Sequence, residues 1–200
     1  ATSRCGGLSA NTGSMVKCTH CGNVAAAGLE AAALAARGFT ANPSIFDAPH
    51  GYVDTFFKAG FDYAMLMQFG QPYRCVDPGM AIKFYPSKYP THFAIAAAID
   101  ARTAIANPAN IQSVHIITPE IPDADRPLPR SGLEGKFSFQ YVTAAALLDG
   151  AIGRETFIDE RRFSRDMADL LGKITLTRDA AIFRDTRNMH VTLNITFADG

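Results

Sequence analysis

A lysine, a histidine and two cysteines lie within five residues of one another, directly before a run of small apolar residues. The four residues are Lys17, Cys18, His20 and Cys21. Residues 24–37 have the composition of a helix, and Gly38 stands where a C-terminal cap is expected. If the helix begins at Gly22 or Asn23, its free N–H groups and the positive end of its dipole face the Lys17 and His20 side chains. This arrangement predicts a binding site for a carboxylate or a phosphate.

A second segment, KFYPSKYPTH over residues 83–92, repeats this combination of cations and an expected helix start. Lys83 is expected at the end of a strand, Ser87 in the following turn, and His92 at the beginning of a helix. These three side chains are therefore candidates for binding an anion. The alternative is that Thr91 only caps the helix and that the lysines of this segment are solvated.

Tyr141 lies on an otherwise apolar helical segment, FSFQYVTAAALLDG. A tyrosine hydroxyl can exchange a proton with a substrate when it lies within hydrogen-bond reach. A tyrosine in such a segment is more often a core residue whose hydroxyl has a partner within the protein. Both interpretations remain open from the sequence.

The Cys18-x-x-Cys21 pair favours a different chemistry, thiol redox exchange or metal binding. A thioredoxin-like pair directly follows a strand, and the sequence before Cys18 has no strand pattern. Haem attachment requires a histidine directly after the second cysteine, where this chain has Gly22. A zinc site requires a second pair of ligands, whereas Cys5 and Cys75 are single and distant. We therefore expect no metal site, and we keep redox or metal chemistry as an alternative that thiol titration against pH would test.

The composition is that of a folded chain without a strong charge. Apolar residues make up 48% of the 200 residues, and nineteen basic residues balance nineteen acidic ones. Because no basic run is present, the composition predicts neither nucleic acid nor a membrane surface as a partner. No segment is long and apolar enough to span a bilayer, and no leader sequence opens the chain. Four cysteines are too few for a disulfide framework, so we expect a cytoplasmic protein. Given the balanced charge, small molecules or other proteins are the expected partners.

The expected fold class is α+β, with an all-helical segment to about residue 70 and a small sheet covered by helices in residues 71–200. In the first segment, short helices are expected from Asn42-Pro43 and over residues 51–58. In the second, helices are expected over 91–106, 137–148 and 165–171, strands over 80–85, 111–118, 173–178 and 190–197, and a proline-rich loop over 119–135. The strands over 173–178 and 190–197 are expected to be neighbours. The missing initiator Met and the final Asp-Gly turn signal lead us to expect a longer gene product.

Three segments in order resemble the MmgE/PrpD family, which includes 2-methylcitrate dehydratases, cis-aconitate decarboxylases and an iminodisuccinate epimerase. The first is GSMVKCTHCGNVAAAGLEAAALAARGFT, the second AIKFYPSKYPTH and the third FSFQYVTAAALLDG. The resemblance extends over most of the chain. It departs from the family pattern at Cys18, which replaces a residue that is often Pro, and at Ser87-Lys88 in the turn.

The resemblance implies a homodimeric, cofactor-free enzyme with its active site between a helical domain and an α+β lid domain. Residues 1–70 would be the C-terminal piece of the helical domain, and residues 71–200 a lid that is incomplete at its C-terminal end. Family pocket positions would be occupied by Lys17, His20, Lys83 and Tyr141, and His92 falls on the T-H of the second segment. The family also uses an Asp and further histidines from a region before this chain.

Removing a proton, water or CO₂ next to a carboxylate builds negative charge, which fixed cations stabilise. Under this hypothesis the catalytic residues are His20, Tyr141 and Lys17, and the substrate-binding residues are Lys83, His92 and Ser87. We expect a lyase that acts on a citrate-like di- or tricarboxylate. The favoured reaction is dehydration of 2-methylcitrate in propionate metabolism, and decarboxylation is the alternative reaction. The alternatives are the thiol chemistry above and a non-catalytic fragment or subunit.

Overall fold

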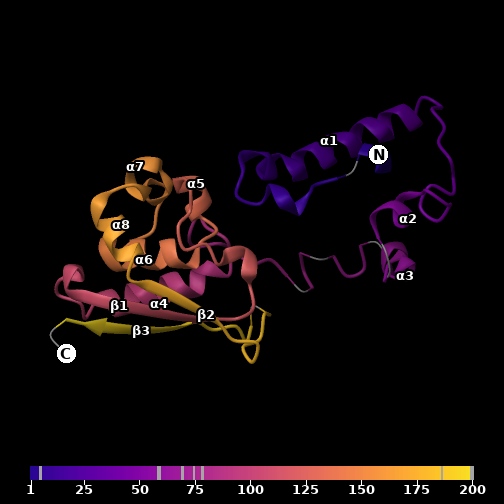
Figure 1. Cartoon of the computed structure of the whole chain (residues 1–200). Coiled ribbons are helices and arrows are strands. Elements are labelled where there is room, and N and C mark those ends of the chain that lie inside the picture. Colours follow the sequence, from indigo (N-terminus) through magenta and orange to yellow (C-terminus); the bar gives the residue numbers. More distant parts are fainter. Residues whose placement is uncertain are drawn as a thin grey trace. The chain divides into compact units, whose positions relative to one another are not determined.

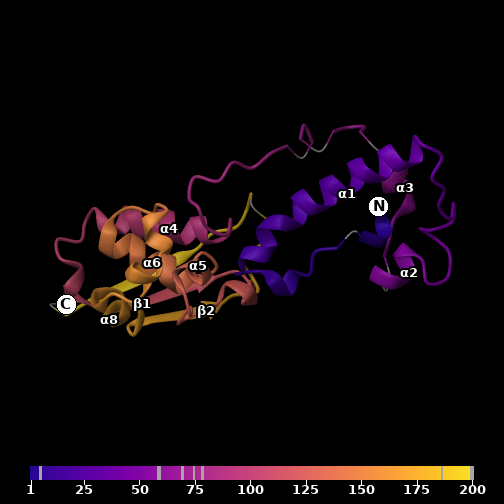
Figure 2. The same cartoon turned by 90° about the horizontal axis from the view of Figure 1, so that it is seen from above.

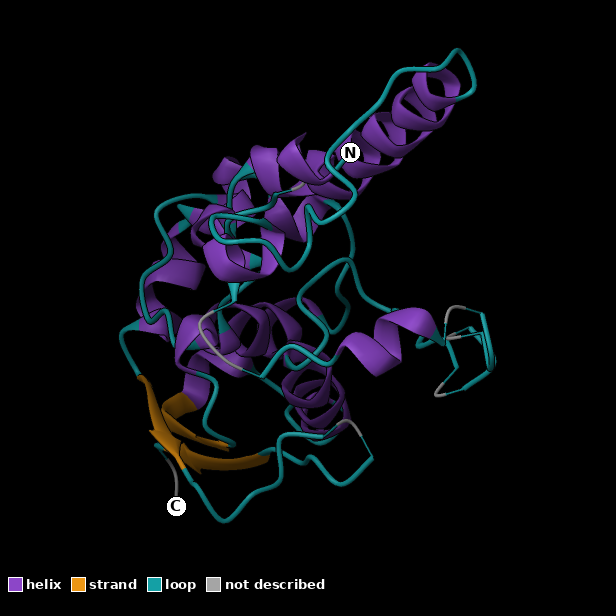
Figure 3. Cartoon of the chain, turned by 90° about the vertical axis from the view of Figure 1, so that its right-hand side faces the viewer, coloured by secondary structure: helices purple, strands orange, loops and turns teal. Residues whose placement is uncertain are grey.

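The computed structural model describes all residues except 5, 58–59, 69, 74, 78, 186 and 199–200. Contacts divide the chain into two units, residues 1–82 and 83–200, which are considered separately (Figure 1). The three strands all lie in the second unit, among helices, as the colouring by secondary structure shows (Figure 3). The predicted α+β fold class is therefore confirmed. The domain boundary at about residue 70 stays a prediction, because it concerns the longer relatives rather than the contacts within this chain.

The first unit contains α-helices and short 3₁₀ turns. These are the helices α1 (His20–Ala35), α2 (Tyr52–Phe56) and α3 (Tyr63–Met67), and the turns η1 (Thr2–Arg4), η2 (Ser9–Asn11) and η3 (Met15–Thr19). The predicted start of the first helix at Gly22 or Asn23 is wrong. The chain enters α1 directly from η3, and the His20 N–H donates to the Lys17 carbonyl. Gly38, with φ of 84°, lies just after α1 in the C-terminal capping position that was predicted for it.

The short helix predicted from Asn42-Pro43 does not form. Residues 43–47 form turns instead. The Asn42 side-chain oxygen accepts a hydrogen bond from the Ser44 N–H at 2.9 Å, and this contact forms a local turn instead of capping a helix. The helix predicted over 51–58 is present as α2, and Lys58 lies outside the described residues.

The second unit contains the other helices and the sheet. Its elements are α4 (Thr91–Arg102), η4 (Pro108–Asn110), β1 (Ile111–Thr118), η5 (Pro122–Ala124), α5 (Gly132–Gly135), α6 (Phe139–Asp149), η6 (Glu155–Phe157), α7 (Asp159–Arg162), α8 (Arg165–Leu171), β2 (Ile174–Arg178) and β3 (Thr192–Phe197). The strand predicted over 80–85 is wrong, since residues 80–83 have no regular structure and residues 84–87 form a bend. The predicted loop over 119–135 contains the short η5 and α5.

The sheet has the strand order β2-β1-β3. Val114 of β1 is in register with Ile174 of the parallel β2 and with Ile195 of the antiparallel β3. The prediction that the last two strands are neighbours is therefore wrong, because β1 lies between them. A parallel pair needs a crossover connection, and the helices α5 to α8 supply it between β1 and β2. Helices α4 and α6 pack on each other and contact β3 and β2 respectively (Figures 1 and 2).

Helix α6 lies at the centre of the second unit, and nine of its residues are buried. The Ser138 hydroxyl caps its first turn by accepting from the Tyr141 N–H at 2.9 Å, and Gly150, with φ of 69°, ends it. A helix that is apolar on all sides belongs in a core, which is where α6 lies. The largest fully buried side chains from other elements include Ile95, Ile111, Val114, Ile116 and Met167. Among the described residues, no helix combines the length and apolar character needed to cross a membrane.

Candidate functional site

The loop before α4 brings three of the predicted binding residues together. The Lys83 Nζ donates to the Ser87 carbonyl oxygen at 3.0 Å. The hydroxyl oxygens of Ser87 and Thr91 are hydrogen-bonded at 2.9 Å, and the Thr91 hydroxyl also lies 2.7 Å from the Lys88 carbonyl oxygen. Ser87 and Thr91 are both buried. The bend therefore fixes the Lys83 ammonium close to the first turn of α4, although no strand positions it.

His92 follows directly and is enclosed by two tyrosines. Its ring stacks on Tyr89 with centroids 5.2 Å apart, and the Tyr85 ring meets it edge-on, also at 5.2 Å. Only 8% of the residue is exposed. Its Nε2 is buried and has no hydrogen-bond partner among the described residues. A buried polar atom without a partner is uncommon in a folded protein and marks His92 as a residue with an unused hydrogen-bonding group.

The surroundings of His92 favour its neutral form. Burial lowers the pKa of the imidazole, and the positive charge of Lys83 lowers this pKa further. The carbonyl groups of Ser87 and Tyr85 act in the opposite direction, but the net shift is downward. At neutral pH this side chain is therefore a hydrogen-bonding group, and the cations of the segment are Lys83 and Lys88, of which Lys88 is paired with Asp123.

The first amides of both predicted helix starts are already used. In α4 the Thr91 N–H donates to the Lys88 carbonyl at 2.9 Å, and the His92 N–H donates to that of Tyr89 at 3.0 Å. In α1 the His20 N–H likewise donates to a carbonyl in η3. These three N–H groups already have partners, so the predicted anion site made of free helical amides does not form there. The segments instead offer an anion a lysine ammonium and the positive end of a helix dipole.

Tyr141 lies in the core of the second unit. It is 0% exposed, and its hydroxyl donates to the Thr156 carbonyl. Burial raises the pKa of this hydroxyl to about 12, so it stays protonated at physiological pH. Its ring fills the space beside Gly135, where a Cβ atom would lie 2.4 Å from Tyr141 Cδ1. These contacts are those of a core tyrosine with a satisfied hydroxyl, the alternative interpretation in the sequence analysis.

Lys17 and His20 belong to the first unit. Lys17 lies on η3 and is exposed, whereas His20 is the first residue of α1 and is partly buried. The absence of a side chain at Gly7 makes room for the imidazole, because a Cβ atom there would lie 2.9 Å from His20 Nδ1. Cys18 and Cys21 are free and exposed on either side of the histidine. The structure thus groups Lys83, Ser87 and His92 within the second unit, and Lys17 with His20 within the first.

The residues that enclose His92 and hold Lys88 were not predicted from the sequence. The available signal for Tyr89 was its spacing of three residues before His92, which places two rings on the same side of a helical turn. No local signal could identify Asp123, which forms an ion pair with Lys88 from a loop distant in sequence. Among the described residues, no three His, Cys, Asp or Glu side chains are grouped as a metal site would require.

The chain has the sequence of a known family of α+β domains. A family model described as the MmgE/PrpD C-terminal domain matches residues 85–200. This match covers more than half of the chain, so the chain belongs to the MmgE/PrpD family. The family resemblance inferred from three sequence segments is confirmed.

Two relatives extend the similarity over the whole chain. Cis-aconitate decarboxylase from Mus musculus is 29% identical over 208 residues, which cover 100% of this chain and 42% of the mouse protein. Cis-aconitate decarboxylase from Homo sapiens is 28% identical over 207 residues, which cover 100% of this chain and 43% of the human protein. The chain therefore spans less than half the length of these two relatives.

Proposed function

We propose that this chain is part of a lyase that acts on a citrate-like di- or tricarboxylate by cofactor-free acid–base chemistry. The observation that carries the proposal is the arrangement before α4. The Lys83 ammonium is held on the Ser87 carbonyl beside His92, whose buried Nε2 has no described partner. A fixed cation suits a substrate carboxylate, and the unused ring nitrogen suits a substrate hydroxyl or carboxylic acid. Membership of the MmgE/PrpD family supports the same reaction class.

In this proposal Lys17 and Lys83 stabilise the negative charge that develops on substrate oxygens, and His20 exchanges protons with the substrate. Ser87 and His92 bind and orient the substrate. A catalytic role for Tyr141 requires its hydroxyl to leave the Thr156 carbonyl, so we assign it that role only as a prediction.

The reaction itself is tested by product analysis. The longer protein that contains this chain is incubated separately with cis-aconitate and with 2-methylcitrate, and the products are identified by mass spectrometry. Loss of CO₂ from cis-aconitate would make it a decarboxylase, the activity in the names of the two relatives. Loss of water from 2-methylcitrate would make it the dehydratase that the sequence analysis favours. A folded protein that converts neither substrate contradicts the proposal.

Substitutions in the first unit test the roles of Lys17 and His20. We expect Lys17→Met and His20→Gln each to lower kcat/KM at least about a hundredfold, the usual effect of losing a charge-stabilising or proton-transferring group. Arg37→Met is the matched control, since it removes an exposed cation beyond the other end of α1. Equal activity in all three variants would remove both residues from the mechanism.

Exposed free thiols at Cys18 and Cys21 support the alternative of redox chemistry. A reactive pair requires a thiolate at neutral pH, so the alternative predicts rapid alkylation of both residues at pH 6. Cys75, which is also exposed and free, is the internal control. The lyase proposal predicts equal alkylation rates at all three cysteines.

The proposal also includes a cytoplasmic location and a homodimer. Sedimentation of the longer protein tests directly whether it is a homodimer. A mass of twice the chain mass supports a dimer, and a monomeric mass at the concentrations used for the activity assays contradicts it.

A further inference from the structure

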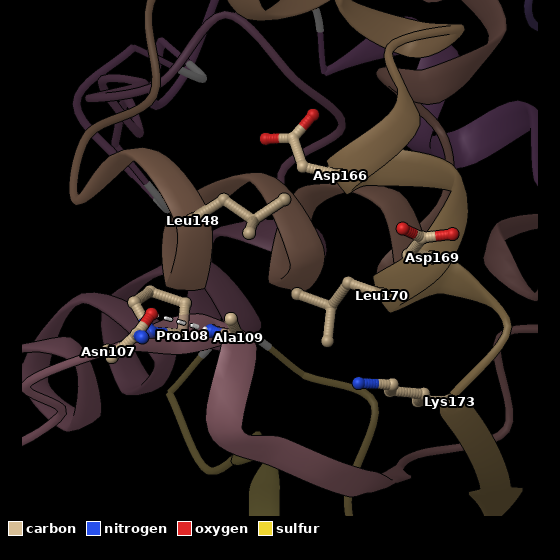
Figure 4. A pocket seen from close by; sticks show the side chains of 8 residues that line it. All are labelled: Asn107, Pro108, Ala109, Leu148, Asp166, Asp169, Leu170 and Lys173. Carbon is tan, nitrogen blue, oxygen red and sulfur yellow. Dashed lines mark hydrogen bonds between the residues drawn. The ribbon is translucent and has the colours of Figure 1, made fainter.

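A cavity in the second unit lies apart from every predicted site residue. It has a volume of about 370 Å³ and opens between η4, the end of α6, and α8 with its junction to β2 (Figure 4). Leu148 and Leu170 point into it and form an apolar floor, and Pro108 lies opposite on η4. Small-molecule sites in proteins combine such a floor with a few placed polar groups, and a volume of this size accommodates about ten to fifteen non-hydrogen atoms.

The rim of this cavity carries opposite charges that do not pair. Asp169 lies on α8 and Lys173 lies four residues later, beyond the end of the helix. Because Lys173 lies outside α8, helical spacing does not place it beside Asp169, and its Nζ donates to the Ile111 carbonyl at 2.7 Å. In Figure 4 the lysine side chain accordingly runs along the side of the cavity away from Asp169.

Each of the two charges retains capacity for a ligand. An ammonium has three N–H donors, and the bond to Ile111 uses one of them. The Asp169 carboxylate has Arg165 as its described ion-pair partner at 4.0 Å, and that arginine side chain is 96% exposed. Such a surface pair contributes little free energy and does not compete strongly with a ligand. Asp166, the other carboxylate of the rim, is different because Arg161 holds it at 2.9 Å.

From this arrangement we infer that the cavity binds a free α-amino acid with an apolar side chain. The α-ammonium lies on Asp169, the α-carboxylate on Lys173, and the side chain on the floor formed by Leu148 and Leu170. The ammonium and carboxylate of an amino acid are separated by a single carbon, so one such ligand presents a partner to each of the two charges on the rim of the cavity. A simple monocarboxylate can pair only with Lys173, and a simple amine can pair only with Asp169.

The inference is tested with L-leucine as the probe and the 200-residue chain as the protein. Methyl-labelled leucine side chains are observed by NMR, and Leu148 and Leu170 are assigned from their Ile variants. We expect saturable shifts of these two methyl groups with a dissociation constant on the order of 1 mM, a value typical of a small ligand with few contacts. Leucinol, which lacks the carboxylate, and 4-methylpentanoate, which lacks the amine, are expected to bind at least about tenfold more weakly.

Variants of the rim provide the second arm of the experiment. Asp169→Asn keeps the shape of the side chain and removes its charge, and we expect it to weaken L-leucine binding at least about tenfold. Asp100→Asn, an exposed carboxylate on α4 away from the cavity, is the matched control and should not change the binding. Lys173→Arg should retain binding better than Lys173→Met. The absence of saturable shifts in the folded chain, or equal binding of L-leucine and 4-methylpentanoate, overturns the inference. Neither outcome bears on the lyase proposal, which concerns other residues.

Discussion

The two units of the chain differ in how they use their apolar residues. Among the described apolar side chains of residues 1–82, Ala27 is the one that is buried, whereas residues 83–200 bury a continuous cluster around α6. Helix α1 exposes Leu29 at 75%, and α6 exposes none of Leu147. Burial of apolar surface is the main source of folding free energy. The stability of this chain is therefore concentrated in residues 83–200.

Truncation of one leucine in each unit gives the largest expected contrast. Leu147→Ala should lower the free energy of unfolding by about 3 kcal/mol, because it removes buried methyl groups and leaves a cavity. Leu29→Ala should change it by less than about 0.5 kcal/mol. Urea unfolding followed by circular dichroism and amide hydrogen exchange measures both values. Similar losses in the two variants would mean that Leu29 is as important to stability as Leu147. Stability would then not be concentrated in residues 83–200.

Two glycines allow the same comparison by adding a methyl group. At Gly135 a new Cβ atom would lie 2.4 Å from the Tyr141 ring, so Gly135→Ala should cost about 1–3 kcal/mol. At Gly28, inside α1, nothing lies within 4 Å, and Gly28→Ala should stabilise the helix by about 0.5–1 kcal/mol. Opposite changes in the thermal midpoint are expected. A loss of stability in Gly28→Ala would indicate a contact on α1 that this account lacks.

Tyr141→Phe separates a structural role from a catalytic one. The variant leaves the buried Thr156 carbonyl without its donor, so we expect a loss of about 1–3 kcal/mol in stability. If the role is only structural, kcat/KM of the folded longer protein stays within about twofold of the original. A fall of a hundredfold or more at unchanged stability would instead support the predicted catalytic role.

The smallest expected effect concerns the pH dependence of the second unit. The pKa of His92 is lowered in the folded chain, so the unfolded state binds a proton more readily than the folded state. Stability is therefore fully present above the unfolded pKa of about 6.5 and falls as the pH drops below it. His92→Gln should flatten the curve of stability between pH 7 and pH 5. An unaltered curve in His92→Gln would contradict the burial argument.

The sequence predicted the elements that have a strong period or a clear end signal. Helix α8 was predicted at its observed bounds, and β1 likewise, because each buries a regular set of apolar residues. The neighbours within the sheet were not predictable from the same pattern, since β1 pairs with strands on both sides through contacts distant in sequence. The strand predicted over 80–85 failed because strand-like composition does not supply a partner strand.

The candidate site was predicted in part. The sequence indicated Lys83, Ser87 and His92 as binding residues, a role that stays a prediction, and the structure places them between the bend over residues 84–87 and the first turn of α4. It did not reveal that the first amides of α1 and α4 are already bonded, because the η3 turn before α1 and the turn at residues 89–90 before α4 depend on backbone geometry that residue types do not specify. The enclosure of His92 by tyrosines was also missed. The residue types therefore predicted which charged side chains are present. The local backbone geometry determines which N–H groups are left for a ligand.

The central claim is that Lys83 binds a substrate carboxylate at the start of α4. The most direct test is kcat/KM for cis-aconitate or 2-methylcitrate in the longer protein carrying Lys83→Met. Lys83→Arg retains the charge, and Arg154→Met removes an exposed cation elsewhere in the second unit. We expect a loss of at least about a hundredfold in Lys83→Met, partial recovery in Lys83→Arg, and no change in Arg154→Met. Equal activity of the folded Lys83→Met and Arg154→Met variants would contradict the claim.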